Sequence, residues 1–276
     1  MSGEASAEVA SFEAKWSAAH PEFGLALAFA RGPDRAAASA FACLVCEIEH
    51  AAFGIREAQP AAVKLQWWAE EFARAARGEA RHPLTQALAE RLASAPVPPL
   101  AWHDVVVGAL AQRDPEPAAD AAALFEGYDR LYSPLATIDA ALFGADARAA
   151  AATLSATRAL RDTAALVDVL RDGKLPLPLD LLARHRLARG DLASASAPRE
   201  AALSEWLTTL SERLRSSTTR EQPIGSLRGA MAGVNAIRAA RAAASAAPLD
   251  TLRDLLARLS LPTTWAAWRA ARRSRT

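Results

Sequence analysis

The sequence predicts an all-α protein whose 276 residues form a single domain. Three observations favour this fold class. Alternating patterns of Val, Ile, Thr and aromatic residues, which are typical of strands, are absent. Alanine, the best helix former, supplies much of the hydrophobic half of the composition. Proline and glycine fall at spacings that suit helix boundaries, and no repeat or change of composition divides the chain.

Helix ends in the first half of the chain are marked by Pro, Gly and Asp. Asp34 can cap a helix that runs to about Gly54. Pro60 stands near the start of the helix that carries Trp67 and Trp68. Pro134 falls inside a later helix and predicts a kink or a restart there. The helices predicted in this half span about residues 21–31, 34–54, 60–78, 83–92 and 102–112, with another starting near 118.

The second half begins with the stretch from Ala145 to Asp172, which predicts one long helix of about seven to eight turns. Gly173 ends this helix, and a proline-punctuated turn leads into a short helix. A Ser/Ala-rich stretch over 190–197 predicts a loop. Four more helices are predicted, over residues 200–216, 225–246, 250–259 and 263–273. Residues 1–18 and the basic tail 272–276 are expected to be flexible.

Charge and cysteine content exclude several classes of protein. The net charge is +1 and both signs are interspersed, which argues against a nucleic-acid partner. Cys43 and Cys46 have no second cysteine pair to complete a zinc site, so we interpret them as small buried hydrophobes. The absence of a disulfide framework fits a reducing cytoplasm, which is the expected location.

The sequence predicts no membrane-spanning segment. The N-terminus lacks the basic and apolar regions of a signal peptide, and no run of 18 apolar residues occurs. Peripheral membrane association stays open. The C-terminal end, with Trp265, Trp268 and several arginines, is either a contact for anionic lipid or an ordinary surface helix with a frayed tail.

Two acids and a histidine interrupt the apolar helix that ends near residue 54: Glu47, Glu49 and His50. A charge on the buried side of a helix is costly unless it meets a partner, water or a metal. These residues are therefore candidates for a functional site. The alternative places Glu47 on the solvent side, with Glu49 and His50 at a rim or in a structural ion pair.

A second candidate group lies at the end of the long helix. Asp168 and Asp172 are four residues apart, so their carboxylates share one helix face. Helix carboxylates in this arrangement can hold Mg²⁺ through their oxygen atoms. Arg171 lies beside them and can contact a phosphate. The alternative is a solvated last turn of the helix.

Taken in order, several stretches resemble the squalene/phytoene synthase family, all-α enzymes that join two prenyl diphosphates head to head. The best match is Lys64-Leu-Gln-Trp-Trp-Ala-Glu-Glu, followed by Gly78 and by Arg81-His-Pro-Leu. Leu170-Arg171-Asp172 is similar to part of the family's second aspartate motif. The resemblance spans roughly residues 20 to 190, with a looser match toward the C-terminus.

The sequence departs from this family at the residues that normally hold the diphosphate. The first motif, Asp-Asp-x-x-Asp in the family, is Glu49-His50-Ala-Ala-Phe53 here, with a single acid. The second motif lacks its last aspartate, and the family's phosphate-binding serine is Glu22. Ionisation of an allylic diphosphate needs the charge of the leaving group to be neutralised. The departures therefore indicate a degenerate family member.

The resemblance implies an isoprenoid-synthase-like helical bundle with a central, largely apolar cavity. It also implies a set of site residues. Mg²⁺ would be held by Glu49, Asp168 and Asp172, and only if the diphosphate site is functional. Diphosphate would contact Arg35, His50 and Arg171, and the cavity would be lined by Phe29, Phe53 and Tyr128.

The expected function is a non-catalytic role, in which the protein binds an isoprenoid or another lipid-like molecule or acts with a protein partner in assembly. Mitochondrial complex I assembly factors include non-catalytic relatives of this kind. A second interpretation is an active prenyltransferase that condenses two prenyl diphosphates in squalene, hopanoid or carotenoid biosynthesis. A third is a purely structural bundle with a filled core.

Overall fold

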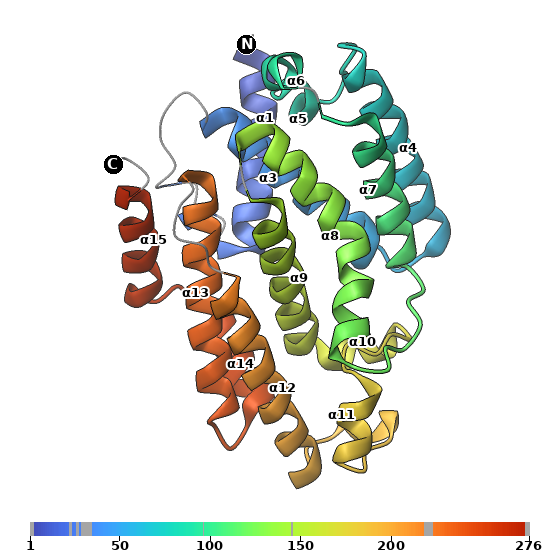
Figure 1. Cartoon of the computed structure of the whole chain (residues 1–276), viewed down its shortest axis with the longest axis vertical. Coiled ribbons are helices and arrows are strands. Elements are labelled where there is room, and N and C mark those ends of the chain that lie inside the picture. The colour runs from blue at the N-terminus through green and yellow to red at the C-terminus, as the bar shows by residue number, and fades with distance from the viewer. Residues whose placement is uncertain are drawn as a thin grey trace.

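The computed structural model describes residues 3–21, 24, 25, 28, 35–95, 97–144, 146–217 and 223–273. Within these residues the chain is helical and contains no strand, which confirms the predicted all-α class (Figure 1). The first half contains α1 (Gly3–Ala19), α3 (Arg35–Glu49), the π-helical turn η1 (His50–Gly54), α4 (Ala58–Ala76), α5 (Pro83–Gln86), α6 (Ala89–Ser94), α7 (Pro99–Ala111) and α8 (Ala121–Phe143).

The second half begins with one long helix, followed by short elements, then by two long helices and finally by two shorter ones. It contains α9 (Ala147–Ala164), α10 (Leu166–Arg171), α11 (Leu179–Arg184), the 3₁₀ turn η2 (Arg189–Ala193), α12 (Ala197–Ser216), α13 (Pro223–Ala243), α14 (Pro248–Ala257) and α15 (Leu261–Arg273). The turn η2 overlaps the start of the stretch 190–197, which was predicted to be a loop.

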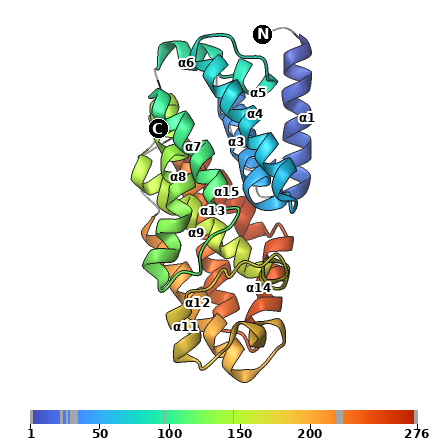
Figure 2. The ribbon, with the colours of Figure 1, turned by 90° about the vertical axis from the view of Figure 1, so that its right-hand side faces the viewer.

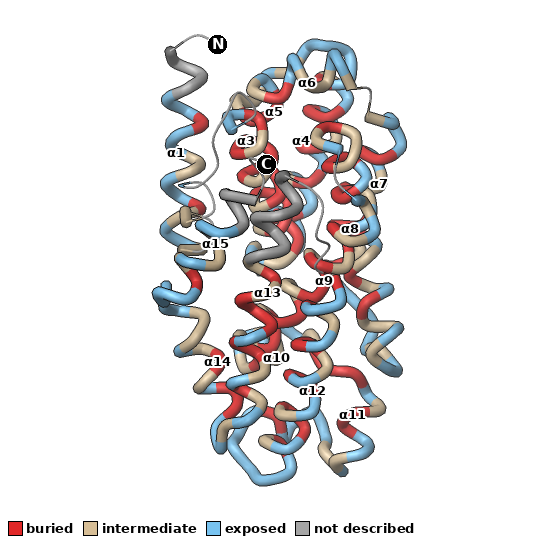
Figure 3. Tube along the Cα trace, turned by 60° about the vertical axis from the view of Figure 1, so that its left-hand side comes forward, coloured by how far each residue is buried: buried red, intermediate tan, exposed pale blue. Residues whose placement is uncertain are grey.

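Successive long helices lie side by side in the order α4, α7, α8, α9, α12 and α13, and α15 covers the outer side of α13 (Figure 1). Helix α3 packs against α8, and α1 packs on the outer side of α3, where it is seen at the edge of the molecule in Figure 2. Buried residues are concentrated along the middle of the bundle, and exposed turns face outward (Figure 3). Helices α8 and α9 therefore form the centre on which the candidate site is built.

Helix α1 is held to α3 by polar contacts as well as by its buried Val9 and Trp16. Glu47 lies buried between two lysines, accepting hydrogen bonds from Lys15 of α1 and from Lys64 of α4, the latter at 2.7 Å. Burial alone would raise the pKa of Glu47, but the two lysines hold it below its ordinary value. The alternative that placed Glu47 on the solvent side is therefore wrong, and the stretch expected to be a flexible end is a helix from Gly3 onward.

The predicted long helix from Ala145 to Asp172 is interrupted at Ala165. The backbone N–H of Asp168 bonds to the carbonyl of Ala165, three residues back, instead of continuing the α-helical pattern. The carbonyl of Ala164 instead accepts a hydrogen bond from Arg253 of α14, at 2.8 Å. A contact from a distant helix thus accompanies the division of the predicted helix into α9 and α10.

Helix α8 remains continuous through Pro134, whose missing N–H leaves the carbonyl of Arg130 without its usual partner within the helix. Gly108 of α7 faces this carbonyl. A Cβ atom at Gly108 would lie 2.6 Å from the carbonyl carbon of Arg130 and 2.8 Å from the Cα atom of Leu131. The two helices therefore approach backbone to backbone, which only glycine allows.

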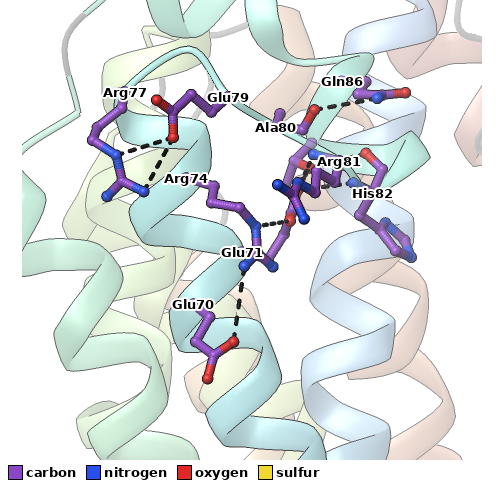
Figure 4. A network of polar contacts seen from close by, with 10 residues as sticks. Glu70, Glu71, Arg74, Arg77, Glu79, Ala80, Arg81, His82 and Gln86 are labelled. Atoms are coloured by element: carbon purple, nitrogen blue, oxygen red, sulfur yellow. Dashed lines mark hydrogen bonds and ion pairs between the residues drawn. The ribbon is translucent and has the colours of Figure 1, made fainter.

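The end of α4 and the start of α5 are joined by a buried carboxylate, shown in Figure 4. Glu71 is fully buried and accepts hydrogen bonds from the backbone N–H groups of Arg81 and His82, at 2.8 and 2.9 Å. The side chains of Thr85 and Arg74 also donate to it. These donors outweigh the effect of burial and lower the pKa of Glu71.

Among the described helices, the stretch Arg35–Gly54 is long and apolar enough, by length and composition, to cross a membrane. About 61% of the apolar window is buried inside the bundle, as is typical of the core helix of a folded domain. Cys43 is fully buried in this helix, Cys46 is partly buried, and both are free thiols.

Candidate functional site

The site begins where α3 widens into the π-helical turn η1. Turns of this kind are rare and occur frequently at functional sites. The backbone N–H of Ile55 closes the turn on the carbonyl of His50, at 3.0 Å. A Cβ atom at Gly54 would overlap the His50 ring, so a larger residue at this position would have to displace that ring. The turn brings Glu49 and Phe53 against α8 and α9.

Glu49 is the last residue of α3 and is buried. One of its carboxylate oxygens accepts a hydrogen bond from the hydroxyl of Tyr132, at 2.6 Å. The other lies 3.4 Å from a guanidinium nitrogen of Arg161. Burial, together with the adjacent Glu49 charge, raises the pKa of Tyr132 well above its ordinary value. Tyr132 therefore stays protonated and donates its hydroxyl hydrogen to the Glu49 carboxylate.

Asp162 has an environment similar to that of Glu49, with a tyrosine and an arginine one helical turn earlier on α8 and α9. Its carboxylate accepts a hydrogen bond from the hydroxyl of Tyr128, at 2.7 Å, and two from the guanidinium of Arg158, one of them at 3.0 Å. Burial and the Asp162 charge raise the pKa of Tyr128. Burial alone would lower the pKa of Arg158, but the Asp162 carboxylate outweighs it and raises that pKa. Arg158 therefore stays a cation beside the Asp162 carboxylate.

These contacts form two acid–tyrosine–arginine triplets, Glu49–Tyr132–Arg161 and Asp162–Tyr128–Arg158. The tyrosines are four residues apart on α8 and the arginines three apart on α9, so each pair lies on one helix face. Each triplet combines one negative and one positive charge. Buried charges are tolerated when they are paired and hydrogen-bonded in this way.

Two small cavities lie on either side of Phe53 and Arg158, which line both of them. The larger has a volume of about 180 Å³ and is also lined by Trp16, His50, Glu49 and Arg161. The smaller has a volume of about 80 Å³ and is also lined by Tyr128, Asp162, Asp172 and Lys174. Neither has the size of a typical ligand pocket, roughly 300–1,000 Å³. The central apolar cavity stays a prediction.

The structure brings some predicted site residues together. Phe53, Tyr128 and Asp172 line the smaller cavity, and Glu49 and His50 line the larger one. His50 lies near Trp16, with their ring centroids 6.0 Å apart. Burial and then the nearby Lys64 and Lys15 lower the pKa of His50, which is therefore neutral at pH 7.

Other predicted site residues lie apart from these cavities. Asp168 and Arg171 are exposed and form an ion pair with each other, at 3.1 Å. Arg35 begins α3 and pairs with Glu13 of α1, at 3.7 Å. Asp172 borders the smaller cavity, but its carboxylate lies 3.3 Å from the exposed Arg56. Phe29, like Glu22, lies outside the described residues.

The residues present do not fit a Mg²⁺ ion held by Glu49, Asp168 and Asp172. Mg²⁺ needs oxygen ligands that converge on one point. In the described part of the chain, no group of three or more Asp, Glu, His or Cys side chains converges in this way. Each of the three carboxylates lies beside an arginine instead. A guanidinium thus supplies, at each acid, the positive charge that a metal ion would provide.

Four residues of the two triplets are absent from the predicted site: Tyr132, Arg158, Arg161 and Asp162. The spacing of Arg158 and Asp162, four apart on an alanine-rich helix, is the signal that points to them in the sequence. Their inward direction and their partners on α3 and α8 depend on the packing of the helices.

Comparisons with known proteins agree with the all-α fold. A family model described as squalene/phytoene synthase matches residues 17–274. A crystal structure of a dehydrosqualene synthase in complex with ligand is similar, with a TM-score of 0.70 and 12% identity over 91% of this chain and 96% of that one. So is squalene synthase HpnC from Alicyclobacillus acidocaldarius, with a TM-score of 0.60 and 15% identity over 93% of this chain and 94% of that one. No curated protein matches.

Proposed function

Because this chain belongs to the squalene/phytoene synthase family, we propose that it is a non-catalytic member that binds an isoprenoid or a similar lipid. The likeness to a dehydrosqualene synthase and to a squalene synthase supports this class of ligand. At the identities found, the likeness of the structures shows the fold alone. The proposal therefore depends on this chain's own residues.

The proposal rests on one observation: the acids that were candidates for metal binding are paired with arginines. Glu49 is the one acid left in the first motif, and it is bonded to Tyr132 and faces Arg161. Breaking such a buried pair leaves an uncompensated charge and costs about 3–5 kcal/mol. Release of Glu49 to bind a metal would incur a cost of this kind. The carboxylate is therefore held in a structural role.

The state of the site's cations also supports a non-catalytic role, because a departing diphosphate needs positive charge beside it. The leaving group develops negative charge, which must be neutralised in the transition state. The two partly buried arginines, Arg158 and Arg161, face Asp162 and Glu49. Their charge is thus largely offset by these acids. An isoprenoid would be held through its apolar chain, and its binding would not depend on Mg²⁺.

The first test measures pyrophosphate release from farnesyl and geranylgeranyl diphosphate in the presence of Mg²⁺. We expect release no faster than with heat-denatured protein. Mg²⁺-dependent release that is abolished in Asp172→Ala but kept in Asp180→Ala would overturn the proposal and favour the active prenyltransferase. Asp180 is a suitable control because it forms a surface ion pair with Arg184, at 2.6 Å.

The second test concerns the ligand. Lipid that stays bound through purification is extracted into organic solvent and identified by mass spectrometry. We expect an isoprenoid, and we expect the affinity for added farnesol to be the same in Mg²⁺ and in EDTA. Absence of both bound lipid and farnesol binding would favour the structural bundle with a filled core.

A further inference from the structure

The C-terminal helix α15 carries an apolar stripe that faces outward. Leu261, Trp265 and Trp268 are spaced four and three residues apart, which places them on one side of the helix. They are 87%, 56% and 41% exposed, so the stripe is open along its length. Leu259, just before the helix, is also exposed. Apolar side chains gathered on one helix face are unlike the single exposed apolar residues of an ordinary surface.

The opposite side of α15 is fixed to the bundle. Thr263 is buried, and the Arg238 guanidinium of α13 lies between the hydroxyl of Thr263 and the backbone carbonyl of Arg258, bonded to the latter at 3.0 Å. The hydroxyl of Ser260 lies 2.8 Å from that of Thr263, at the start of the helix. Because this face is held inward, the stripe cannot turn into the core. Figure 1 shows α15 at the edge of the bundle, on the outer side of α13.

The charge around the stripe has a single sign. From residue 259 to residue 276 the sequence contains four arginines and no acid. The guanidinium carbon of Arg269 lies 4.1 Å from the centroid of the Trp265 ring, so one cation stands directly beside the stripe. Tryptophan and arginine together are typical of helices that lie in the interface of an anionic membrane.

We propose that α15 binds an anionic lipid surface, with its apolar stripe in the headgroup region and Arg269 among the lipid phosphates. A second copy of the chain fits less well. A helix of 13 residues is about 20 Å long. A stripe one side chain wide on such a helix covers far less than the roughly 800 Å² that each partner buries in a stable protein complex. The excess of arginines would also repel the same surface on another copy.

The test is flotation of the full chain with lipid vesicles. One set is made of phosphatidylcholine alone, and the other of equal parts phosphatidylcholine and phosphatidylglycerol. We expect binding to the second set, little binding to the first, and weaker binding at high salt. Trp265→Glu should lower the bound fraction by about tenfold or more, because it removes an anchor and adds a repelled charge. Arg269→Gln should lower binding to a smaller extent.

Leu100→Glu is the matched control, since Leu100 is an exposed leucine on α7, far along the chain from α15. It should bind vesicles as the unaltered chain does, and circular dichroism should show all variants folded. The proposal is overturned if the unaltered chain fails to bind phosphatidylglycerol vesicles, or if Leu100→Glu loses as much binding as Trp265→Glu. A dimer in sedimentation velocity that Trp265→Glu dissociates would assign the stripe to a second copy instead.

Discussion

The guanidinium of Arg158 lies over the ring of Phe53, with its central carbon 3.8 Å from the ring centroid. The same guanidinium is bonded to the buried Asp162. Where the family's first motif ends in an aspartate, this chain has a phenylalanine, and a cation stacks on its face. The two side chains line both cavities. The positively charged Arg158 side chain therefore lies between α9 and η1.

Arg158→Leu should lower the free energy of unfolding by about 3–5 kcal/mol, because Asp162 would remain buried without its cation. The double variant Arg158→Leu/Asp162→Leu should recover most of this loss. Urea denaturation at pH 7 measures both. Arg184→Leu, which breaks an exposed pair with Asp180, should change the unfolding free energy by less than about 1 kcal/mol. An equally small effect of Arg158→Leu would contradict a structural role for the triplet.

Glu71→Ala should destabilise the protein by about 2–4 kcal/mol, because several donors at the α4–α5 junction would lose their buried acceptor. Glu70→Ala is the neighbouring control, since the Glu70 side chain is mostly exposed and makes only a long ion pair with Arg74, at 3.8 Å. It should cost less than about 1 kcal/mol. Thermal and urea denaturation of the two variants compare them directly, and similar losses would disprove the role of Glu71.

His82 should make the protein less stable as the pH falls below about 6.5. Burial and the nearby Lys64 lower the pKa of its imidazole, despite the opposing charges of Glu71 and Glu47. The unfolded chain therefore takes up a proton at a pH where the folded chain does not, so protonation favours unfolding. The Nδ1 atom of His82 also accepts a hydrogen bond from the backbone N–H of Leu84, at 3.2 Å, and protonation would remove this cap.

The variant His82→Asn tests this mechanism, because asparagine keeps a capping acceptor but does not titrate. Unfolding free energies at pH 7 and near pH 5.5 should differ less in this variant than in the unaltered chain. Part of the dependence of the unfolding free energy on pH, here called the slope, should remain, since the pKa of His50 is also lowered. His103→Asn, on an exposed position of α7, should leave the slope unchanged. No change of slope in His82→Asn would exclude His82 as the source.

Gly108→Ala should cost about 1–3 kcal/mol, because the added methyl group would meet the backbone of α8, which cannot rotate away as a side chain would. Gly127→Ala lies on the facing helix and meets no atom within 4 Å. It should instead raise the unfolding free energy by about 0.5–1 kcal/mol, since alanine favours helix more than glycine does. Urea denaturation of both variants measures the two effects. If both variants changed the unfolding free energy in the same direction, the close contact of α7 and α8 would be contradicted.

The helices were predictable because each depends mainly on local signals. Alanine content and the positions of Pro and Gly predict most helix boundaries to within a few residues. The break between α9 and α10 was not predictable, since it accompanies a hydrogen bond from Arg253, 89 residues away in sequence. The restart predicted at Pro134 is not found, since α8 is continuous from Ala121 to Phe143. Gly108 of α7 approaches the carbonyl group that Pro134 leaves free.

Two acids that line the cavities, Glu49 and Asp172, were predicted from the sequence, but Asp162 and the partners of the acids were not. Glu49 stands out because it interrupts an apolar helix, and its burial agrees with that reading. Tyr132 and Arg161, however, lie 83 and 112 residues further along the chain. Only the packing of α3 against α8 and α9 shows that these residues neutralise it. The spacing of Asp168 and Asp172 predicted a shared face, but the helix ends between them and each pairs with a different arginine.

The outward stripe of α15 also gives the protein an optical property. Its seven indoles divide into a buried set, Trp16, Trp68, Trp102 and Trp206, and an exposed set, Trp67, Trp265 and Trp268. A soluble quencher such as acrylamide should reach the exposed set first, so the emission that survives should shift to the blue. Two of the three quenchable indoles lie on one short helix. Any partner that covers α15 should therefore reduce the quenching of tryptophan emission by acrylamide. This measurement needs no attached label.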